Sequence, residues 1–255
     1  MTTDRLNQDL AKVPAVTLGF WVIKVLATTL GETGGDTLSM TYNLGYLVSS
    51  AIFVVPLIVL VVAQVVARRF HPFLYWATII ASTTAGTTMA DFATRSLGIG
   101  YAGGSALLLL CVLVSLMAWR LVTGSVAVET VSSARSEIFY WITITFSQTL
   151  GTALGDWAAN DGGLGYLGGA AVFGGTLLVL VGISRFASVS RVLLFWVAFI
   201  LTRPLGATVG DFLDKPLAKG GLDLSRPLAS AVLLVAIVVL IALIPQRPGA
   251  HPQNS

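Results

Sequence analysis

One stretch of sixteen residues, WVIKVLATTLGETGGD at 21–36, occurs in four related copies along the chain. In every copy an Asp follows the Trp by fifteen positions, a Gly stands ten positions after the Trp, and an aromatic residue precedes the Trp. A register kept over four copies marks an internal repeat, whose copies fold as equivalent units. The other copies span 76–91, 141–156 and 196–211.

The chain is too apolar for an ordinary soluble domain. Of its 255 residues 55% are hydrophobic and 11% are charged, whereas a soluble domain has about a quarter of its residues charged. Uninterrupted apolar runs such as 51–67 and 228–244 approach the roughly 20 residues that a membrane-spanning helix needs. We therefore expect an all-α integral membrane protein with eight transmembrane helices, built from four parallel two-helix repeats.

Polar stretches divide these apolar runs into units. An even number of spans per repeat gives every copy the same orientation, so all four repeated Asp residues are expected on one side of the membrane. We expect an amino-terminal cytoplasmic segment at 1–13, repeats at 14–67 and 68–119, a cytoplasmic linker at 120–137, repeats at 138–184 and 185–244, and a cytoplasmic tail at 245–255.

Basic residues indicate the orientation. Nine Lys and Arg residues lie in the termini and the loops between repeats, and four lie in the turns within repeats. Cytoplasmic loops carry an excess of Lys and Arg, so both termini are expected in the cytoplasm and the Asp turns outside.

Composition also excludes several functions. The net charge of +3 is scattered over the loops, which argues against nucleic-acid binding. A single Cys, Cys111, rules out an internal disulfide, and His71 and His251 lie outside the apolar runs, so haem and His-built zinc sites lack ligands. No nucleophile with a neighbouring base is visible, and we expect neither enzymatic activity nor a cofactor.

Small residues recur at positions ten and fourteen after each Trp. This spacing places two small residues on one helix face, where helix backbones can approach closely within a membrane. We expect the first helices of the four repeats to pack together at their outer halves. The residues are Gly31, Gly35, Gly86, Ala90, Gly151, Gly155, Gly206 and Gly210.

The four repeated acids, Asp36, Asp91, Asp156 and Asp211, allow two interpretations. Each acid could end its helix and face headgroups and water. Alternatively, four acids on one face of a bundle form a funnel that attracts cations. The sequence leaves both interpretations open.

A polar layer lies on the same helices, at Thr28, Thr83 and Gln148. Hydroxyl groups in spans often bond to their own helix or across an interface, which would explain these residues structurally. Ionisable residues within a span are costlier and by default have a partner in the bundle interior. Three are present, Lys24, Glu32 and Arg203, and we expect their partners across the bundle, for instance Glu32 with Arg203.

Two resemblances follow from these motifs. The four tandem copies with a Trp and a Gly-Asp ending resemble a bacterial membrane-protein family described only as a repeat of unknown function. That resemblance implies a multi-span protein of the inner membrane and brings no activity. The segment from Glu32 to Thr37 is similar to the E-x-G-D-[KR]-[ST] motif of cation/proton exchangers, although its acids are four apart and its basic residue is missing.

The leading functional hypothesis is a transporter or exporter of cations, foremost divalent metal ions, with coupling to protons. Carboxylates and hydroxyls suit such hard cations. The expected metal ligands are Glu32, Asp36, Asp91, Asp156 and Asp211, with Lys24 and Arg203 as internal counter-ions.

Two alternatives stay open. Lys24 and Arg203 could instead bind a small anion such as a carboxylate, or the repeats could form a membrane scaffold or sensor without transport. The expected partners are the lipid bilayer and the small cation, and a homo-oligomer is compatible with the sequence.

Overall fold

A computed structural model describes residues 12–186 and 188–249, so most of the expected terminal segments at 1–13 and 245–255 lies outside it. The described part is all-α, with eight long helices and no strand beyond an isolated bridge between Pro14 and Pro248. The helices are α2 (Leu18–Asp36), α3 (Gly45–Val66), α4 (Pro72–Asp91), α5 (Gly100–Thr123), α6 (Ala134–Asp156), α7 (Gly165–Phe186), α8 (Arg191–Asp214) and α9 (Arg226–Leu243).

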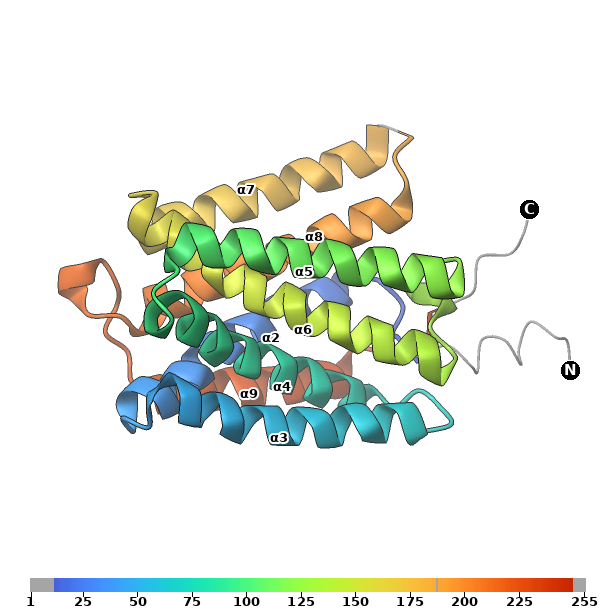
Figure 1. Ribbon diagram of the computed structural model, residues 1–255, viewed down its shortest axis with the longest axis horizontal. Helices are drawn as coiled ribbons and strands as arrows, with labels where there is room; N and C mark the ends of the chain where they lie inside the picture. Colours follow the sequence, from blue (N-terminus) through green and yellow to red (C-terminus); the bar gives the residue numbers. More distant parts are fainter. Residues whose placement is uncertain (1–11, 187, 250–255) are drawn as a thin grey trace, which may run out of the picture.

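Four inner helices form a closed ring. These are the first helices of the repeats, and contacts run from α2 to α4, α6, α8 and back to α2. The second helices lie outside the ring (Figure 1). Each packs mainly on the inner helix of the following repeat, so that α3 lies on α4, α5 on α6, α7 on α8, and α9 on α2. The last repeat thereby closes onto the first.

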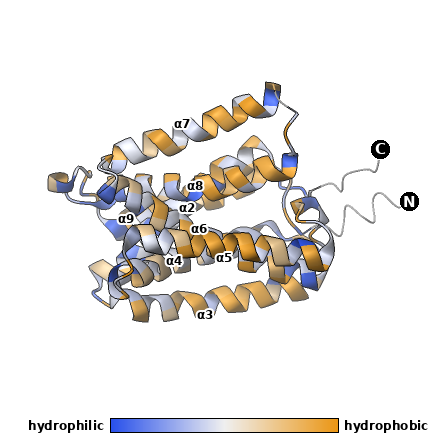
Figure 2. Cartoon of the chain, turned by 45° about the horizontal axis from the view of Figure 1, so that its top comes forward, coloured by the Kyte–Doolittle hydropathy of each residue, from blue (hydrophilic) through white to orange (hydrophobic). Residues whose placement is uncertain are grey.

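Five of the helices, α3, α5, α7, α8 and α9, are long and apolar enough to cross a membrane. Figure 2 shows hydrophobic residues along much of α3 and α5. The inner helices α2, α4 and α6 carry more polar residues, and their polar side chains are enclosed by neighbouring helices. The protein is therefore a membrane-embedded helical bundle whose polar groups lie in its centre.

Glycine sets the spacing of the ring, as the small-residue pattern predicts. The Gly ten places after each Trp contacts the next inner helix. The residue that it meets there lies seven places after the Trp of that helix. A Cβ atom at any of these four positions would lie within 2.1–3.0 Å of that neighbour, so only Gly allows the approach. The pairs are Gly31 with Thr83, Gly86 with Gln148, Gly151 with Arg203, and Gly206 with Thr28.

Aromatic residues close the ring at the end where residues 12 and 249 lie. The aromatic residue before each Trp packs against the Trp of the next repeat, for example Tyr75 on Trp141 at 5.7 Å between ring centroids. The same contact recurs from Phe195 back to Trp21 at 5.8 Å. Across this layer the hydroxyls of Tyr75 and Tyr140 share a hydrogen bond of 2.6 Å. These contacts account for the Trp at a fixed register.

The helix boundaries differ from the expected ones at the Asp end. The repeated Asp residues do not terminate their helices, because α2, α4 and α6 continue into five-residue π-helical turns: Thr37–Thr41, Phe92–Ser96 and Trp157–Asp161. Gly45, Gly100 and Gly165 then start the outer helices with φ between +64° and +72°, a conformation that favours Gly.

The expected linker at 120–137 is shorter in the structure. Helix α5 runs to Thr123 and α6 begins at Ala134, so both helices extend into this range.

Candidate functional site

Positions spaced by four residues on each inner helix face the middle of the ring, because residues four apart share a helix face. They form four layers, which we call the axial column, and every member is at most 3% exposed. From the aromatic end outward the layers are Lys24, Ile79, Ile144 and Phe199; Thr28, Thr83, Gln148 and Arg203; Glu32, Thr87, Thr152 and Ala207; and Asp36, Asp91, Asp156 and Asp211.

Arg203 occupies the centre of this column. Its Nη2 lies within hydrogen-bond distance of Glu32 Oε2 at 3.0 Å, Thr87 Oγ1 at 2.6 Å and Thr152 Oγ1 at 2.5 Å, and shares its two N–H groups among them. The expected pairing of Glu32 with Arg203 is confirmed. The absence of a side chain at Gly151 makes room for it, since a Cβ there would lie 2.2 Å from Arg203 Cγ.

Lys24 lies deeper than the acids, next to the aromatic end. Its Nζ donates to Gln148 Oε1 at 3.3 Å and lies 4.1 Å from the centroid of the Phe199 ring. A ring face attracts a cation electrostatically, so this contact partly replaces water. Within the part of the chain that the structure describes, no carboxylate lies within salt-bridge distance of Lys24. The expected role of Lys24 as a counter-ion of the acids is therefore not supported by a direct contact.

The four repeated Asp residues are buried and paired, so the interpretation that they face water is wrong. Lys215 Nζ bridges Asp36 and Asp211, with 2.8 Å to Asp211 Oδ1. Arg95 bridges the other two, at 2.9 Å to Asp91 and 3.1 Å to Asp156. Two cations thus hold four carboxylates in one layer.

Lys215 and Arg95 were not among the expected site residues, although the sequence contains a signal for them. Each follows the Asp of its own repeat by four residues, the spacing at which a helical acid and base meet. Burial alone would lower the pKa of Lys215, but the carboxylates of Asp211, Asp36 and Asp214 raise it well above its usual value. Lys215 is therefore a cation in this layer.

A vestibule of about 620 Å³ lies at the Asp end of the column. Lys215 and Arg95 line its wall together with Lys219, Arg226 and Tyr101. Arg226 Nε also bonds Asp214 Oδ2 at 3.0 Å, which adds a further ion pair beside the ring. The buried carboxylates are thus separated from the vestibule by the side chains of these paired cations.

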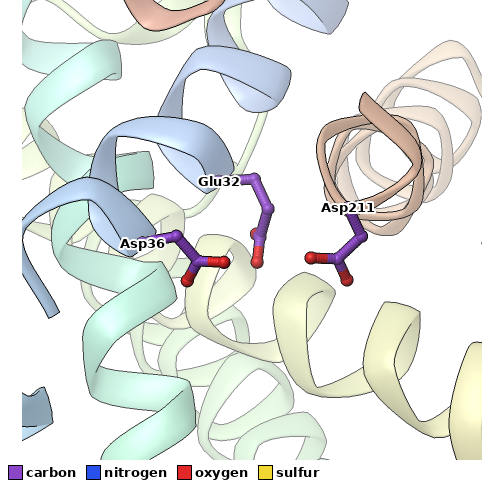
Figure 3. Close-up of side chains that lie close together, drawn as sticks. All are labelled: Glu32, Asp36 and Asp211. Atoms are coloured by element: carbon purple, nitrogen blue, oxygen red, sulfur yellow. The ribbon is translucent and has the colours of Figure 1, made fainter. Parts of the chain in front are cut away.

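Three acids form a cluster suited to a metal ion. Glu32, Asp36 and Asp211 each offer a carboxylate oxygen, and these oxygens all lie within 4.8 Å of one another. Figure 3 shows the three side chains converging from α2 and α8. Asp91 and Asp156, which were also expected as ligands, do not belong to this cluster and are held by Arg95. Within the described residues, Asp36 Oδ1 accepts no hydrogen bond.

Comparison with known families bears directly on this repeat architecture. The family described as Repeat of Unknown Function (DUF347) matches the chain four times, at residues 19–70, 74–125, 139–189 and 194–244. The chain belongs to this family. No curated protein and no solved structure matches it. Each DUF347 match contains one inner helix and the outer helix that follows it.

The DUF347 repeats of this protein agree in their packing residues and in the Asp layer, and they differ in the other layers of the axial column. The Trp, the close-approach Gly and the Asp are present in all four copies, whereas Lys24, Glu32 and Arg203 each occur in one copy only. Buried ionisable groups are costly in a membrane protein and a symmetric bundle does not need them. The three ionisable residues are thus the point at which the DUF347 copies of this chain depart from symmetry inside the bundle.

Proposed function

We propose that this protein transports small cations across the bacterial inner membrane, with divalent metal ions as the leading substrate class. The observation that supports this most directly is the buried cluster of Glu32, Asp36 and Asp211, whose oxygens lie within 4.8 Å of one another. Lys215 extends its ammonium into the same layer. Two of the three carboxylates, Asp36 and Asp211, therefore already share a positive charge, which a small cation could replace.

Charge balance favours a divalent ion. When all four are ionised, Asp36, Asp91, Asp156 and Asp211 contribute four negative charges, and Lys215 and Arg95 return two positive ones. The layer thus retains two negative charges, which are costly in a buried site. A divalent cation with oxygen ligands would neutralise them. Glu32 is balanced separately by Arg203.

Access to the cluster is unequal from the two ends. The vestibule lies on the Asp side, where Lys215 stands at the junction of α8 and the following loop. Cation entry would require this side chain to leave its place between Asp36 and Asp211. At the other end the aromatic layer and the Tyr75–Tyr140 hydrogen bond close the column. This arrangement fits one state of an alternating-access cycle. Protons exchanged at the same carboxylates would provide the coupling.

Cation binding is the first test. Unfolding temperatures of the purified protein in detergent should rise with at least one of Mn²⁺, Zn²⁺, Mg²⁺ or Ca²⁺, because a ligand present at 100 times its Kd stabilises the folded state by about 2.7 kcal/mol. Asp36→Asn and Glu32→Gln should each abolish the rise. Asp161→Asn, which changes an exposed acid outside the column, should retain it. A response to none of these metals would contradict the metal assignment and favour a scaffold.

The proposed topology has eight spans, with the termini in the cytoplasm and the vestibule outside. A reporter that is active only in the cytoplasm should be active when fused to either end of the chain, and a reporter that is active only outside should be inactive there. A reporter inserted in the loop between α8 and α9, beside Gly220, should be active only outside. Opposite reporter activity at the two termini would exclude an even number of spans.

The contacts weigh against the anion alternative. Arg203 is already neutralised by Glu32, and Lys24 is bonded to Gln148 and packed on Phe199. A carboxylate ligand would have to displace Glu32, which is tethered to the same column. In the thermal assay this alternative requires a response to small carboxylates that Lys24→Met removes.

A further inference from the structure

Helix α7 packs on the bundle along only part of its length. Near its start Gly169 meets Thr208, and Gly174 lies near Leu205, both on α8. Figures 1 and 2 show α7 diverging from the other helices toward the end where the termini lie. Helices α7 and α8 therefore separate along the second half of α7.

A groove of about 850 Å³ lies between α7, α8 and α2 in this region. Its walls are mainly apolar and include Trp21, Val25, Val181, Phe195 and Ala198. The volume falls within the range of about 300–1,000 Å³ typical of small-molecule sites, which are likewise mainly apolar with a few polar groups. Val181 on its rim is 59% exposed, so the groove opens toward the surroundings of the bundle. In a membrane these surroundings are acyl chains.

The charged groups of the groove lie at one end and are of opposite sign. Glu129 and Arg191 both line it there, together with the hydroxyl-bearing Ser184. A guanidinium matches a phosphate group through charge-assisted hydrogen bonds, and a carboxylate matches an ammonium. A ligand that satisfies this end therefore carries both a phosphate and an amine with N–H donors, joined to an apolar tail.

We propose that the groove binds one molecule of phosphatidylethanolamine, with an acyl chain along the apolar wall, the phosphate at Arg191 and the ammonium at Glu129. Phosphatidylcholine has a methylated amine without N–H donors, and phosphatidylglycerol has no cation. Neither lipid can therefore donate a charged hydrogen bond to Glu129. The bound chain would lie against Ala198 and Thr202 of α8, immediately before Arg203 of the axial column. This site is independent of the proposed cation transport.

Native mass spectrometry of the delipidated, detergent-solubilised protein tests this assignment. Titration with each of the three lipids should give one tightly bound phosphatidylethanolamine and weaker binding of the others. Glu129→Gln and Arg191→Gln should each weaken phosphatidylethanolamine roughly tenfold, the loss expected for one hydrogen bond to a charged group. Ala198→Phe should abolish binding by filling the groove.

The matched controls are Arg69→Gln and Ala51→Phe, which alter exposed residues away from the groove and should bind as the parent protein does. Thermal unfolding without lipid checks that Ala198→Phe folds, and Ala198→Leu takes its place if it does not. The proposal is overturned if phosphatidylcholine or phosphatidylglycerol binds as tightly as phosphatidylethanolamine, if the groove-filling variant retains the lipid, or if a second copy of the chain occupies the groove as a lipid-free dimer.

Discussion

Arg203→Met is expected to lower the free energy of unfolding by about 3–5 kcal/mol, the cost of removing one partner of a buried ion pair. Methionine keeps the atoms that pack against Gly151, but it removes the guanidinium that bonds Glu32, Thr87 and Thr152. Glu32 is then left as a buried charge without its cation. Chemical denaturation of the purified protein in mixed micelles would measure the loss.

A double variant separates the pair from the packing. Replacing a buried ion pair by neutral groups of similar size is often close to neutral, so Arg203→Met with Glu32→Gln should recover most of the lost stability. Arg69→Met removes an exposed arginine and should change stability by less than about 0.5 kcal/mol. Additive losses in the double variant would show that Glu32 does not depend on Arg203.

The repeated small residues were enough to predict that the inner helices pack on one another, but not the order in which they do so. The structure shows a closed ring, in which each copy has equivalent neighbours on both sides. The pairing of Glu32 with Arg203 could also be predicted, because each is an ionisable residue within an apolar segment and needs a partner in the interior.

The placement of the outer helices could not be predicted. Lipid chains are as apolar as Leu and Val, so the sequence of an outer helix carries little information about which inner helix it covers. Each outer helix in fact lies on the inner helix of the following repeat.

The cations that hold the acidic layer were missed because they resemble topology signals. Lys215 lies beyond the end of α8, where a basic residue ordinarily reports the side of the membrane, and Arg95 lies in a turn. Only the four-residue spacing from Asp211 and from Asp91 identifies them as partners. The same spacing reaches Met40 and Asn160 in the other two copies, so the layer departs from fourfold symmetry.

This asymmetry connects the fold with the proposed function. Glycine and tryptophan maintain a symmetric ring, and the column inside it contains Lys24, Glu32 and Arg203 once each. The proposed ion site uses single charged groups at particular positions of the column. A symmetric ring with an asymmetric lining provides them without altering the contacts between the helices.

Gly206→Ala is expected to disrupt that ring. A Cβ at this position would lie 2.1 Å from Thr28 Oγ1 and 2.8 Å from the Thr28 carbonyl carbon. The hydroxyl can rotate away, but the backbone carbon cannot, so α8 must move away from α2. That movement would also lengthen the bond from Arg203 to Glu32. The loss should reach or exceed the roughly 1–3 kcal/mol typical of overpacked cores.

Gly175→Ala is the matched control for this prediction. It makes the same substitution within a helix, at a site where a Cβ would meet nothing within 4 Å. Replacing a helical Gly by Ala stabilises the helix by roughly 0.5–1 kcal/mol, so this variant should unfold at an equal or higher denaturant concentration than the parent protein. Because both variants gain the same helical preference, the difference between them isolates the contact of α8 with α2. Equal stability of the two variants would mean that Gly206 is not needed for the approach of these helices.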